Sequence, residues 1–184
     1  MKIAEGRRTE VYLIEYRSRR AILKKPKAGG ESSILREYRA LSYLQALGIE
    51  GVPKVYELND QGLIEEYIPG EHFYLFARKA SKEELKRVIL EALGIAFQLD
   101  LVGVRHQELS LAHKHILVAD RTYLIDFGHS KLGIHRRSLP QLAAYIFFRR
   151  SFYELFDFRL EELKEALRDY KRGNPKKLLK VLTP

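Results

Sequence analysis

Two acidic residues, Glu108 and Asp126, lie in parts of the sequence where carboxylates can do chemistry. Asp126 ends a short apolar stretch typical of a strand and is followed by Phe127 and Gly128. A carboxylate at a strand end, next to a flexible glycine, is well placed to hold a divalent cation. Glu108 precedes it across a predicted strand hairpin, and its carboxylate can accept a proton from a hydroxyl group. Either residue alone also fits an ordinary strand end or loop. The two together, in this order and on either side of a predicted hairpin, indicate a functional site.

The segment 106–110 reads H-Q-E-L-S, and the segment 126–128 reads D-F-G. This order resembles the protein kinase-like superfamily, in which H-x-D-L-x-x-x-N precedes a hairpin and then D-F-G. The nearest resemblance is to small atypical kinases, namely the RIO-type kinases of ribosome biogenesis and the minimal kinase associated with the KEOPS complex. Their loops read H-x-D-L-S or H-x-D-L-T. The archaeal predicted serine/threonine kinases with Glu in this loop look similar too.

The resemblance implies a lysine that holds the α- and β-phosphates of ATP. Lys24, at the end of the stretch 21–24, is the matching residue, and Lys25 is the alternative. Because side chains two positions apart share a strand face, Ile22 is expected beside the lysine, lining an adenine pocket. Glu37, on the next predicted helix, matches the glutamate that pairs with this lysine in the family.

Two more segments match the nucleotide-binding parts of the family. Residues 3–12 align with the loop that covers the phosphates, but Gly6 is the one glycine of that pattern that is kept. Backbone amides around Gly6 are expected to contact phosphate. The segment 65–70 resembles the hinge whose backbone hydrogen-bonds adenine, which assigns Glu66, Tyr67 and Ile68 to cofactor binding. ATP and Mg²⁺ are the implied cofactors.

The sequence departs from the family pattern at two positions. Glu108 replaces the catalytic aspartate, keeping the carboxylate but adding a methylene, and a misplacement of about 1 Å can lower a rate on the order of a hundredfold. The metal-binding asparagine falls on His113 when counted from Glu108, or on His115 when aligned by the following strand. Imidazole is a poor ligand for Mg²⁺, so Asp126 is expected to be the main metal ligand. His106 is expected to support the loop backbone.

The hydrophobic pattern predicts strands first and helices afterwards, with a change at Pro69 and Gly70. Before the change it predicts, in order, two strands, a helix and two strands, at residues 11–16, 21–25, 31–48, 52–58 and 62–68. After it we expect a helix from a capping box at Ser81 toward Gly103, short strands at 115–119 and 123–126, and helices from about Pro140 and at 160–170. The predicted fold class is α+β, a minimal two-lobed kinase-like fold. It forms a single domain over residues 1–184, with a strand-rich N-lobe (1–68) and a helical C-lobe (69–184).

Composition limits the chemistry further. The chain has 184 residues and no cysteine, which excludes disulfides, iron–sulfur clusters and cysteine nucleophiles. No apolar run approaches the roughly 20 residues that span a bilayer, and the first residues do not resemble a signal peptide. We therefore expect a cytoplasmic protein with no membrane partner.

The net charge of +9 suggests an anionic partner besides ATP, such as RNA or the ribosome. Basic residues crowd the first hairpin and recur in the second half, where they include His135, Arg136, Arg137, Arg149 and Arg150. Scattered, solvated surface charge is the competing interpretation. The aromatic residues between positions 145 and 158 are interpreted as packing between helices, because no RNA-recognition pattern accompanies them.

These observations predict Mg-ATP-dependent phosphoryl transfer, with a protein serine or threonine as the acceptor by family analogy, or simple ATPase activity. The competing hypothesis is a catalytically weak nucleotide-binding module that acts as an RNA- or ribosome-associated assembly factor. It is motivated by Glu108, by the histidines at the second metal position and by the basic surface. A small-molecule phosphotransferase is disfavoured, because the segment after Gly128 is short for the helical substrate lobe of those enzymes. No pattern indicates the oligomeric state.

Overall fold

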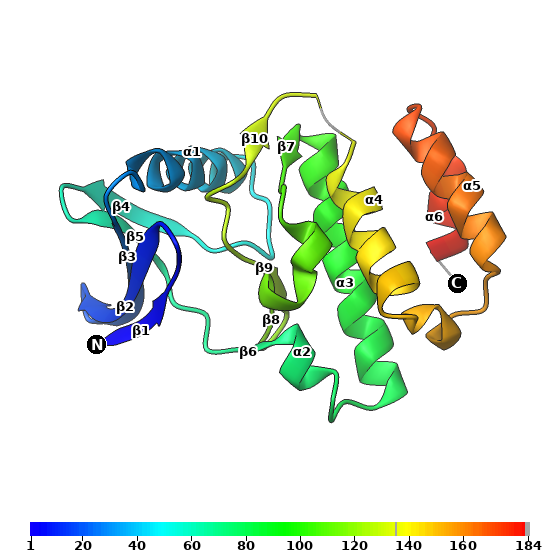
Figure 1. Cartoon of the computed structure of the whole chain (residues 1–184), viewed down its shortest axis with the longest axis horizontal. Coiled ribbons are helices and arrows are strands. Elements are labelled where there is room, and N and C mark those ends of the chain that lie inside the picture. The colour runs from blue at the N-terminus through cyan, green and yellow to red at the C-terminus, as the bar shows by residue number, and fades with distance from the viewer. Residues whose placement is uncertain (135, 183–184) are drawn as a thin grey trace.

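The computed structural model describes residues 1–134 and 136–182, so His135, a member of the predicted basic set, lies outside the described residues. Within them, a strand-rich N-terminal part stands beside a helical C-terminal part (Figure 1). The predicted α+β class and two-lobed kinase-like arrangement are confirmed. The boundaries of a single domain divided at residue 68 stay a prediction.

An antiparallel sheet of five strands forms the N-terminal part, in the order β1-β2-β3-β5-β4. Its strands are β1 (Lys2–Glu5), β2 (Thr9–Tyr16), β3 (Arg19–Pro26), β4 (Val55–Asn59) and β5 (Gly62–Glu66). The predicted hairpin is formed by β2 and β3, which turn at Arg17 and Ser18 with φ of 50° and 61°. Such positive φ values at both turn residues match the twist of a tight hairpin. The sequence analysis did not predict β1, whose residues it assigned to the phosphate-covering loop.

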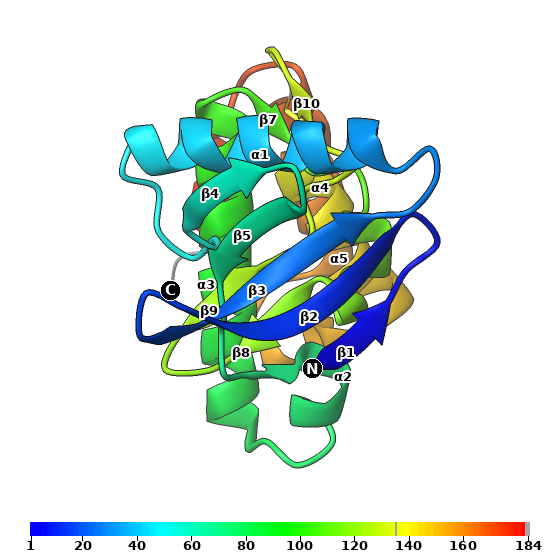
Figure 2. The same cartoon turned by 90° about the vertical axis from the view of Figure 1, so that its left-hand side faces the viewer.

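The helix α1 (Glu31–Ala46) crosses the sheet (Figure 2). Its buried apolar residues include Ile34, Leu41 and Leu44, as the helical spacing predicted, and Gly48 follows it with a φ of 69°. A left-handed glycine at this position is a common helix ending. Leu41 and Leu44 belong to the same hydrophobic core as the helices of the C-terminal part. The helix α1 therefore packs on the core of the C-terminal part, while Ala21, Leu23 and Ile64 of the sheet form a second, smaller cluster.

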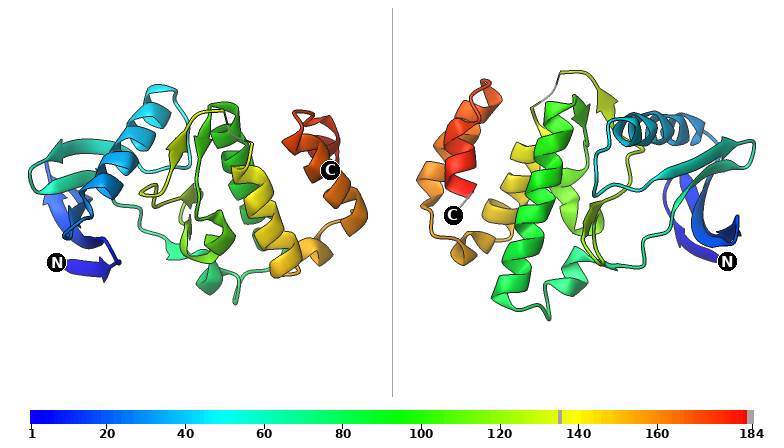
Figure 3. Two further views of the ribbon diagram at one scale, coloured as in Figure 1. Left: turned by 45° about the horizontal axis from the view of Figure 1, so that its top comes forward. Right: turned by 180° about the vertical axis from the view of Figure 1, so that it is seen from behind.

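The C-terminal part is built around α3 (Lys82–Leu101), the longest helix of the described residues (Figure 3). The capping box predicted for its start is present: Glu84 N donates to Ser81 Oγ at 3.2 Å, and Ser81 N donates to Glu84 Oε2 at 2.8 Å. Before α3 come β6 (Glu71–His72) and α2 (Phe73–Phe76), and after it come β7 (Val104–Arg105), the 3₁₀ helix η1 (Leu109–Lys114), β8 (Ile116–Val118), β9 (Thr122–Leu124) and β10 (Lys131–Leu132). The predicted hairpin after the Glu108 loop is thus β8 and β9.

Helices close the chain. They are α4 (Ser138–Ala143), which continues as the π-helix η2 (Ala144–Arg149), then η3 (Phe152–Leu155), α5 (Leu160–Lys171) and α6 (Lys176–Leu182). Phe147 packs edge-to-face on Phe156 and Phe158, with ring centroids 5.3 and 5.2 Å apart, so the interpretation of the aromatic residues as core is correct there. Phe148 is an exception, with an exposed fraction of 36%. Across the described part of the chain, every helix is too short or too polar to cross a membrane.

Asp100, near the end of α3, joins three helices. Its Oδ1 accepts hydrogen bonds from the backbone N–H groups of Arg137 (3.1 Å) and Ser138 (2.8 Å). Its Oδ2 accepts from Leu139 N at 3.1 Å and from the Tyr170 hydroxyl at 3.0 Å. Burial raises the pKa of Asp100, and these donors oppose that rise. One buried carboxylate thus fixes the first turn of α4 and the end of α5 against α3.

Replacing Asp100 by Ala is expected to lower the free energy of unfolding by about 2–4 kcal/mol, because it leaves several buried donors without an acceptor. Urea unfolding followed by circular dichroism measures the loss. Asp60→Ala, at an exposed turn between β4 and β5, is the matched control and is expected to change the midpoint little. Equal midpoints for Asp100→Ala and wild type would contradict the role assigned to Asp100.

Candidate functional site

A cleft of about 920 Å³ lies between the N-terminal sheet and the helical part. Residues of both parts line it, from the β1–β2 loop to the segment around Asp126. The cleft brings together all the predicted site residues except Glu108, namely Gly6, Ile22, Lys24, Glu37, Glu66, Tyr67, Ile68, His113, His115 and Asp126. Its volume lies within the range of small-molecule sites.

Lys24 is the cation of this cleft. Its Nζ lies 2.7 Å from Glu37 Oε1 and 2.8 Å from Glu65 Oε1. Burial lowers the pKa of Lys24, but the charges of Glu37, Glu65 and Asp126 outweigh burial and raise the pKa above its ordinary value. The ammonium group is therefore charged although it is largely removed from water.

Lys25, the alternative lysine, points elsewhere. Its Nζ lies over the Tyr12 ring, 5.2 Å from the centroid. Neighbouring residues of a strand face opposite sides of the sheet, so only one of the two lysines can enter the cleft. Lys24 lines the cleft, which favours it over Lys25 as the phosphate-binding residue.

Glu65 is a cleft residue that the sequence analysis did not single out. It lies opposite Ile22 in the register of β3 and β5, and its exposed fraction is 3%. Burial raises the pKa of Glu65 to about 7, although Lys24 opposes the rise. Its Oε2 is buried and has no hydrogen-bond partner among the described residues. The available signal was strand alternation, which puts Leu63 and Glu65 on one face of β5.

The helix α1 ties Lys24 to the segment that follows Asp126. Glu37 Oε1 accepts a hydrogen bond from Phe127 N at 2.9 Å as well as binding Lys24. On the same helix, Ser33 Oγ, one turn before Glu37, and Arg36 Nε, directly before it, donate to the Gly128 carbonyl at 3.2 and 2.9 Å. A Cβ atom at position 128 would overlap Ser33 Oγ, so this approach requires glycine.

His106 supports the backbone on both sides of the site, in the way predicted for it. Its Nε2 lies 2.9 Å from the Ile125 carbonyl, and its Nδ1 accepts from Glu108 N at 3.3 Å. These partners require a neutral ring that is protonated on Nε2, and burial lowers the pKa of His106 accordingly. Asp126 follows Ile125 with a φ of 67°, a backbone conformation that non-glycine residues seldom adopt.

Glu108, His115 and Asp126 form a group that can hold a metal ion. One ligand atom from each lies within 4.8 Å of the others, and His115 Nδ1 is 3.8 Å from Asp126 Oδ2. Glu108 Oε2 and His115 Nδ1 are buried without hydrogen-bond partners among the described residues. Such orphaned acceptors fit a bound cation, because an ion would satisfy both. The two carboxylates suit Mg²⁺, whereas the imidazole nitrogen is a ligand that Mg²⁺ seldom uses.

His113, the other candidate for the second metal position, makes different contacts. Its ring stacks on Tyr145 at a centroid distance of 5.8 Å and meets the edge of the Tyr74 ring at 6.3 Å. It lines the cleft but is not a member of the three-residue group. The geometry favours His115 over His113 as a metal ligand.

The electrostatic environment gives the carboxyl groups of Glu108 and Asp126 different pKa values. Burial, followed by the charges of Asp126 and Glu37, raises the pKa of Glu108 to about 7. Burial also acts to raise the pKa of Asp126, but Lys24 and then His115 and His106 lower it below its ordinary value. Asp126 is therefore an anion at neutral pH, and Glu108 can take up and release a proton there.

The strand β5 leads into the segment predicted to bind adenine. Glu66 N donates to the Lys54 carbonyl at 2.8 Å, and Lys54 N donates to Glu66 Oε2 at 3.1 Å, which anchors the start of this segment. Ile68 and Ile22 are both buried and line the cleft together with Leu117. An apolar slot of this kind suits the flat, largely apolar ring of a purine.

Comparison with known proteins adds a family to this geometry. Residues 1–178 match the phosphotransferase enzyme family (APH). The chain belongs to this family. An uncharacterized protein of Methanocaldococcus jannaschii is 25% identical over 114 residues, which cover 58% of this chain and 98% of the relative.

Membership of the phosphotransferase family confirms the resemblance to the protein kinase-like superfamily at a coarser level. It does not distinguish the RIO-type or KEOPS-associated kinases, so those resemblances stay predictions. It also removes the length argument against other phosphotransferases, because the match extends to residue 178 and includes the short segment after Gly128.

Protonation of His115 is expected to cost the fold stability in acid, while Glu65 and Glu108, whose pKa values are raised to about 7, contribute in the opposite direction. Burial, and next the proximity of His106, lower the pKa of His115 from 6.5 to about 4; His113 and Lys114 act in the same direction, and Asp126 opposes them. A pKa lowered by folding contributes stability that is present above pH 6.5 and is lost as the pH falls toward 4. The loss should be on the order of 2–3 kcal/mol.

Thermal unfolding in EDTA between pH 7.5 and about 4.5 measures this dependence. The His115→Asn variant is expected to gain stability relative to wild type as the pH falls, while Gln61→Asn, a neutral change at an exposed turn between β4 and β5, keeps the wild-type slope. Identical slopes for all three proteins would rule out His115 as the titrating residue.

Proposed function

We propose that this phosphotransferase transfers the γ-phosphoryl group of ATP to a hydroxyl group, with Mg²⁺ as its metal. The observation that carries the proposal is the charged Lys24, held by Glu37 and Glu65 in a cleft that Asp126 also lines. Phosphoryl transfer requires little covalent chemistry from the protein. It requires cations and carboxylates that are already in position around the phosphates.

ATP would lie along the cleft from the β5 end to Asp126. The adenine would pack between Ile22 and Ile68 and hydrogen-bond the backbone of residues 66–68. Lys24 would bind the α- and β-phosphates, and amides around Gly6 would cover them, since Gly6 lines the same cleft. Glu37 orients Lys24 and would not itself touch the nucleotide.

The carboxylates at the far end of the cleft would supply the metal site and the base. Asp126, with its lowered pKa, would hold the ion together with the phosphates, and His115 would be an additional ligand. Bound Mg²⁺ would neutralise charge that develops on the transferred group. Glu108 would orient the acceptor hydroxyl and accept its proton, because its carboxylate lies beside Asp126 and its pKa is raised to about 7.

A serine or threonine of a protein is the acceptor we propose, by analogy with protein kinases. A second candidate function is supported by the donor set itself. The imidazole of His115 and the longer side chain of Glu108 both depart from the kinase pattern, and either can weaken catalysis. The alternative is a nucleotide-binding module that assists assembly on RNA or the ribosome and turns ATP over slowly or not at all.

Lys24→Met is expected to reduce Mg-ATP turnover at least a hundredfold, because the phosphates lose their buried cation. Lys25→Met is the matched control, since Lys25 lies on the Tyr12 ring outside the cleft, and it should stay within about twofold of wild type. Circular dichroism must accompany the assay, because Lys24→Met leaves Glu37 and Glu65 buried without their counter-ion. Equal losses in the two folded variants would refute the assignment of Lys24.

Glu108→Gln is expected to reduce turnover by roughly 10²–10⁴-fold while changing ATP affinity little, because the amide cannot accept the acceptor's proton. Glu108→Asp, which keeps a carboxylate, should retain part of the activity. Magnesium-dependent ATP turnover and nucleotide titration are measured in parallel. If wild type and Glu108→Gln both bind ATP but turn it over only at the background rate, the enzyme hypothesis is refuted and the assembly-factor hypothesis is favoured.

A further inference from the structure

A second hollow, of about 780 Å³, lies on the helical part and shares no lining residue with the ATP cleft. It is lined by Arg105, Ile134, Arg136, Arg137, Pro140, Gln141, Ala144 and Lys171, which we call the basic pocket. Four of these described residues are cationic, and none is acidic or aromatic. The pocket therefore offers concentrated positive charge without a carboxylate to balance it.

The cations of the basic pocket have no anionic partner within the described ranges. Arg105, Arg136, Arg137 and Lys171 are absent from the ion pairs that engage other basic residues of the chain, such as Lys2, Lys24 and Arg121. The Nε of Arg105 is buried and has no hydrogen-bond acceptor there. A buried donor without an acceptor is unfavourable, and an anion in the pocket would satisfy it.

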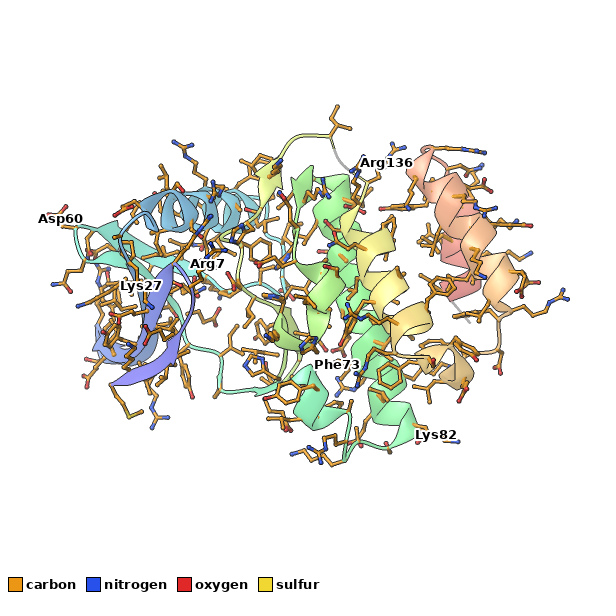
Figure 4. All side chains as sticks on the ribbon, in the orientation of Figure 1. Arg7, Lys27, Asp60, Phe73, Lys82 and Arg136 are labelled. Carbon is orange, nitrogen blue, oxygen red and sulfur yellow. The ribbon has the colours of Figure 1, made fainter. Side chains whose placement is uncertain are left out.

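The backbone around the pocket is anchored by Asp100 and Tyr170. Asp100 binds the backbone of Arg137 and Ser138 and the hydroxyl of Tyr170, which precedes Lys171. Arg136 lies against Gly173, where a Cβ atom would overlap its guanidinium group. Figure 4 shows Arg136 at the upper edge of the helical part, between the start of α4 and the end of α5. The Cα positions of Arg137 and Lys171 are therefore set by Asp100 and its partners.

The same elements connect the pocket to the Glu108 loop. Gln141 Nε2, from the pocket lining, donates to the Gln107 carbonyl at 2.7 Å. On the other side of the loop, His106 N donates to Ser138 Oγ at 3.2 Å. Arg105 itself directly precedes His106. A ligand in the basic pocket would therefore have a defined position relative to Glu108.

We propose that the basic pocket binds phosphate groups of the molecule that the protein phosphorylates, so that the acceptor already carries phosphate before the transfer. This inference rests on the proposed function. Guanidinium groups match phosphate oxygens in pairs, and a doubly charged phosphate balances several cations better than a carboxylate does. Because none of the described lining residues is aromatic, the ligand is recognised through its phosphates and not by base stacking.

Titration calorimetry with inorganic phosphate tests the pocket in the full chain, with the cleft saturated by a non-hydrolysable ATP analogue and Mg²⁺. Wild type is expected to bind one phosphate saturably. Arg105→Gln with Arg137→Gln should weaken binding at least tenfold, since each charge-assisted hydrogen bond contributes that much or more. Arg137→Gln with Lys171→Gln, at two exposed positions, gives the same readout if the half-buried Arg105 proves necessary for folding.

Arg20→Gln with Arg78→Gln removes the same charge from exposed sites elsewhere and should leave phosphate affinity unchanged. Absence of phosphate binding, or equal weakening in the control, would overturn the inference. Binding of a single-stranded oligouridylate is measured in parallel. Salt-sensitive binding that falls equally in the pocket variants and in the control would also overturn the inference, because such behaviour reports general surface charge. ATP turnover of wild type in phosphate-free buffer tests the proposed function separately. Saturable phosphate binding without ATP turnover would support the pocket as a phosphate site and refute the phosphotransferase activity proposed for the cleft.

Discussion

The buried ion group of Lys24, Glu37 and Glu65 is the interaction on which the rest of the site depends. Charges this far from water are stable only when they are paired and hydrogen-bonded, so β3, β5 and α1 must keep their relative positions. The two carboxylates exceed the single ammonium in charge. The ion group therefore has a net negative charge when both carboxylates are ionised, and the raised pKa of Glu65 reflects this excess. A ligand that brings its own cation would suit such a cleft.

The resemblance to the kinase-like superfamily made Lys24 and Glu37 predictable, and strand alternation then placed Ile22 on the same face as Lys24. Helical periodicity alone would not have selected Glu37, because a glutamate on an amphipathic helix is ordinarily exposed and this one is buried. Glu65 was missed because a carboxylate in an apolar strand is ordinarily exposed, and only the opposing Lys24 explains its burial. The choice between His113 and His115 depends on how η1 turns the chain, and no spacing rule contains that turn.

The secondary structure likewise has elements that the sequence predicts and elements that it does not. Elements with a strong internal pattern, such as β2, β3, α1 and α3, were predicted with their approximate limits. Elements that exist only through a distant partner were not: β10 is two residues long and pairs Leu132 with Val104, and β6 pairs with β8. Long-range pairing of such short segments leaves almost no trace in composition. The predicted phosphate-covering loop included the residues of β1 for a related reason. The strand β1 depends on its pairing with β2, which local sequence does not reveal.

One oxygen of Glu37 binds both the Lys24 ammonium and the Phe127 amide, which are on opposite walls of the cleft. Any separation of the two walls would have to break one of these bonds in a nearly dry environment. Glu37 therefore couples the positions of the two walls, and opening the cleft has a free-energy cost at this one oxygen. The Phe127 amide proton, which is buried and bonded to that carboxylate, should consequently exchange slowly with solvent.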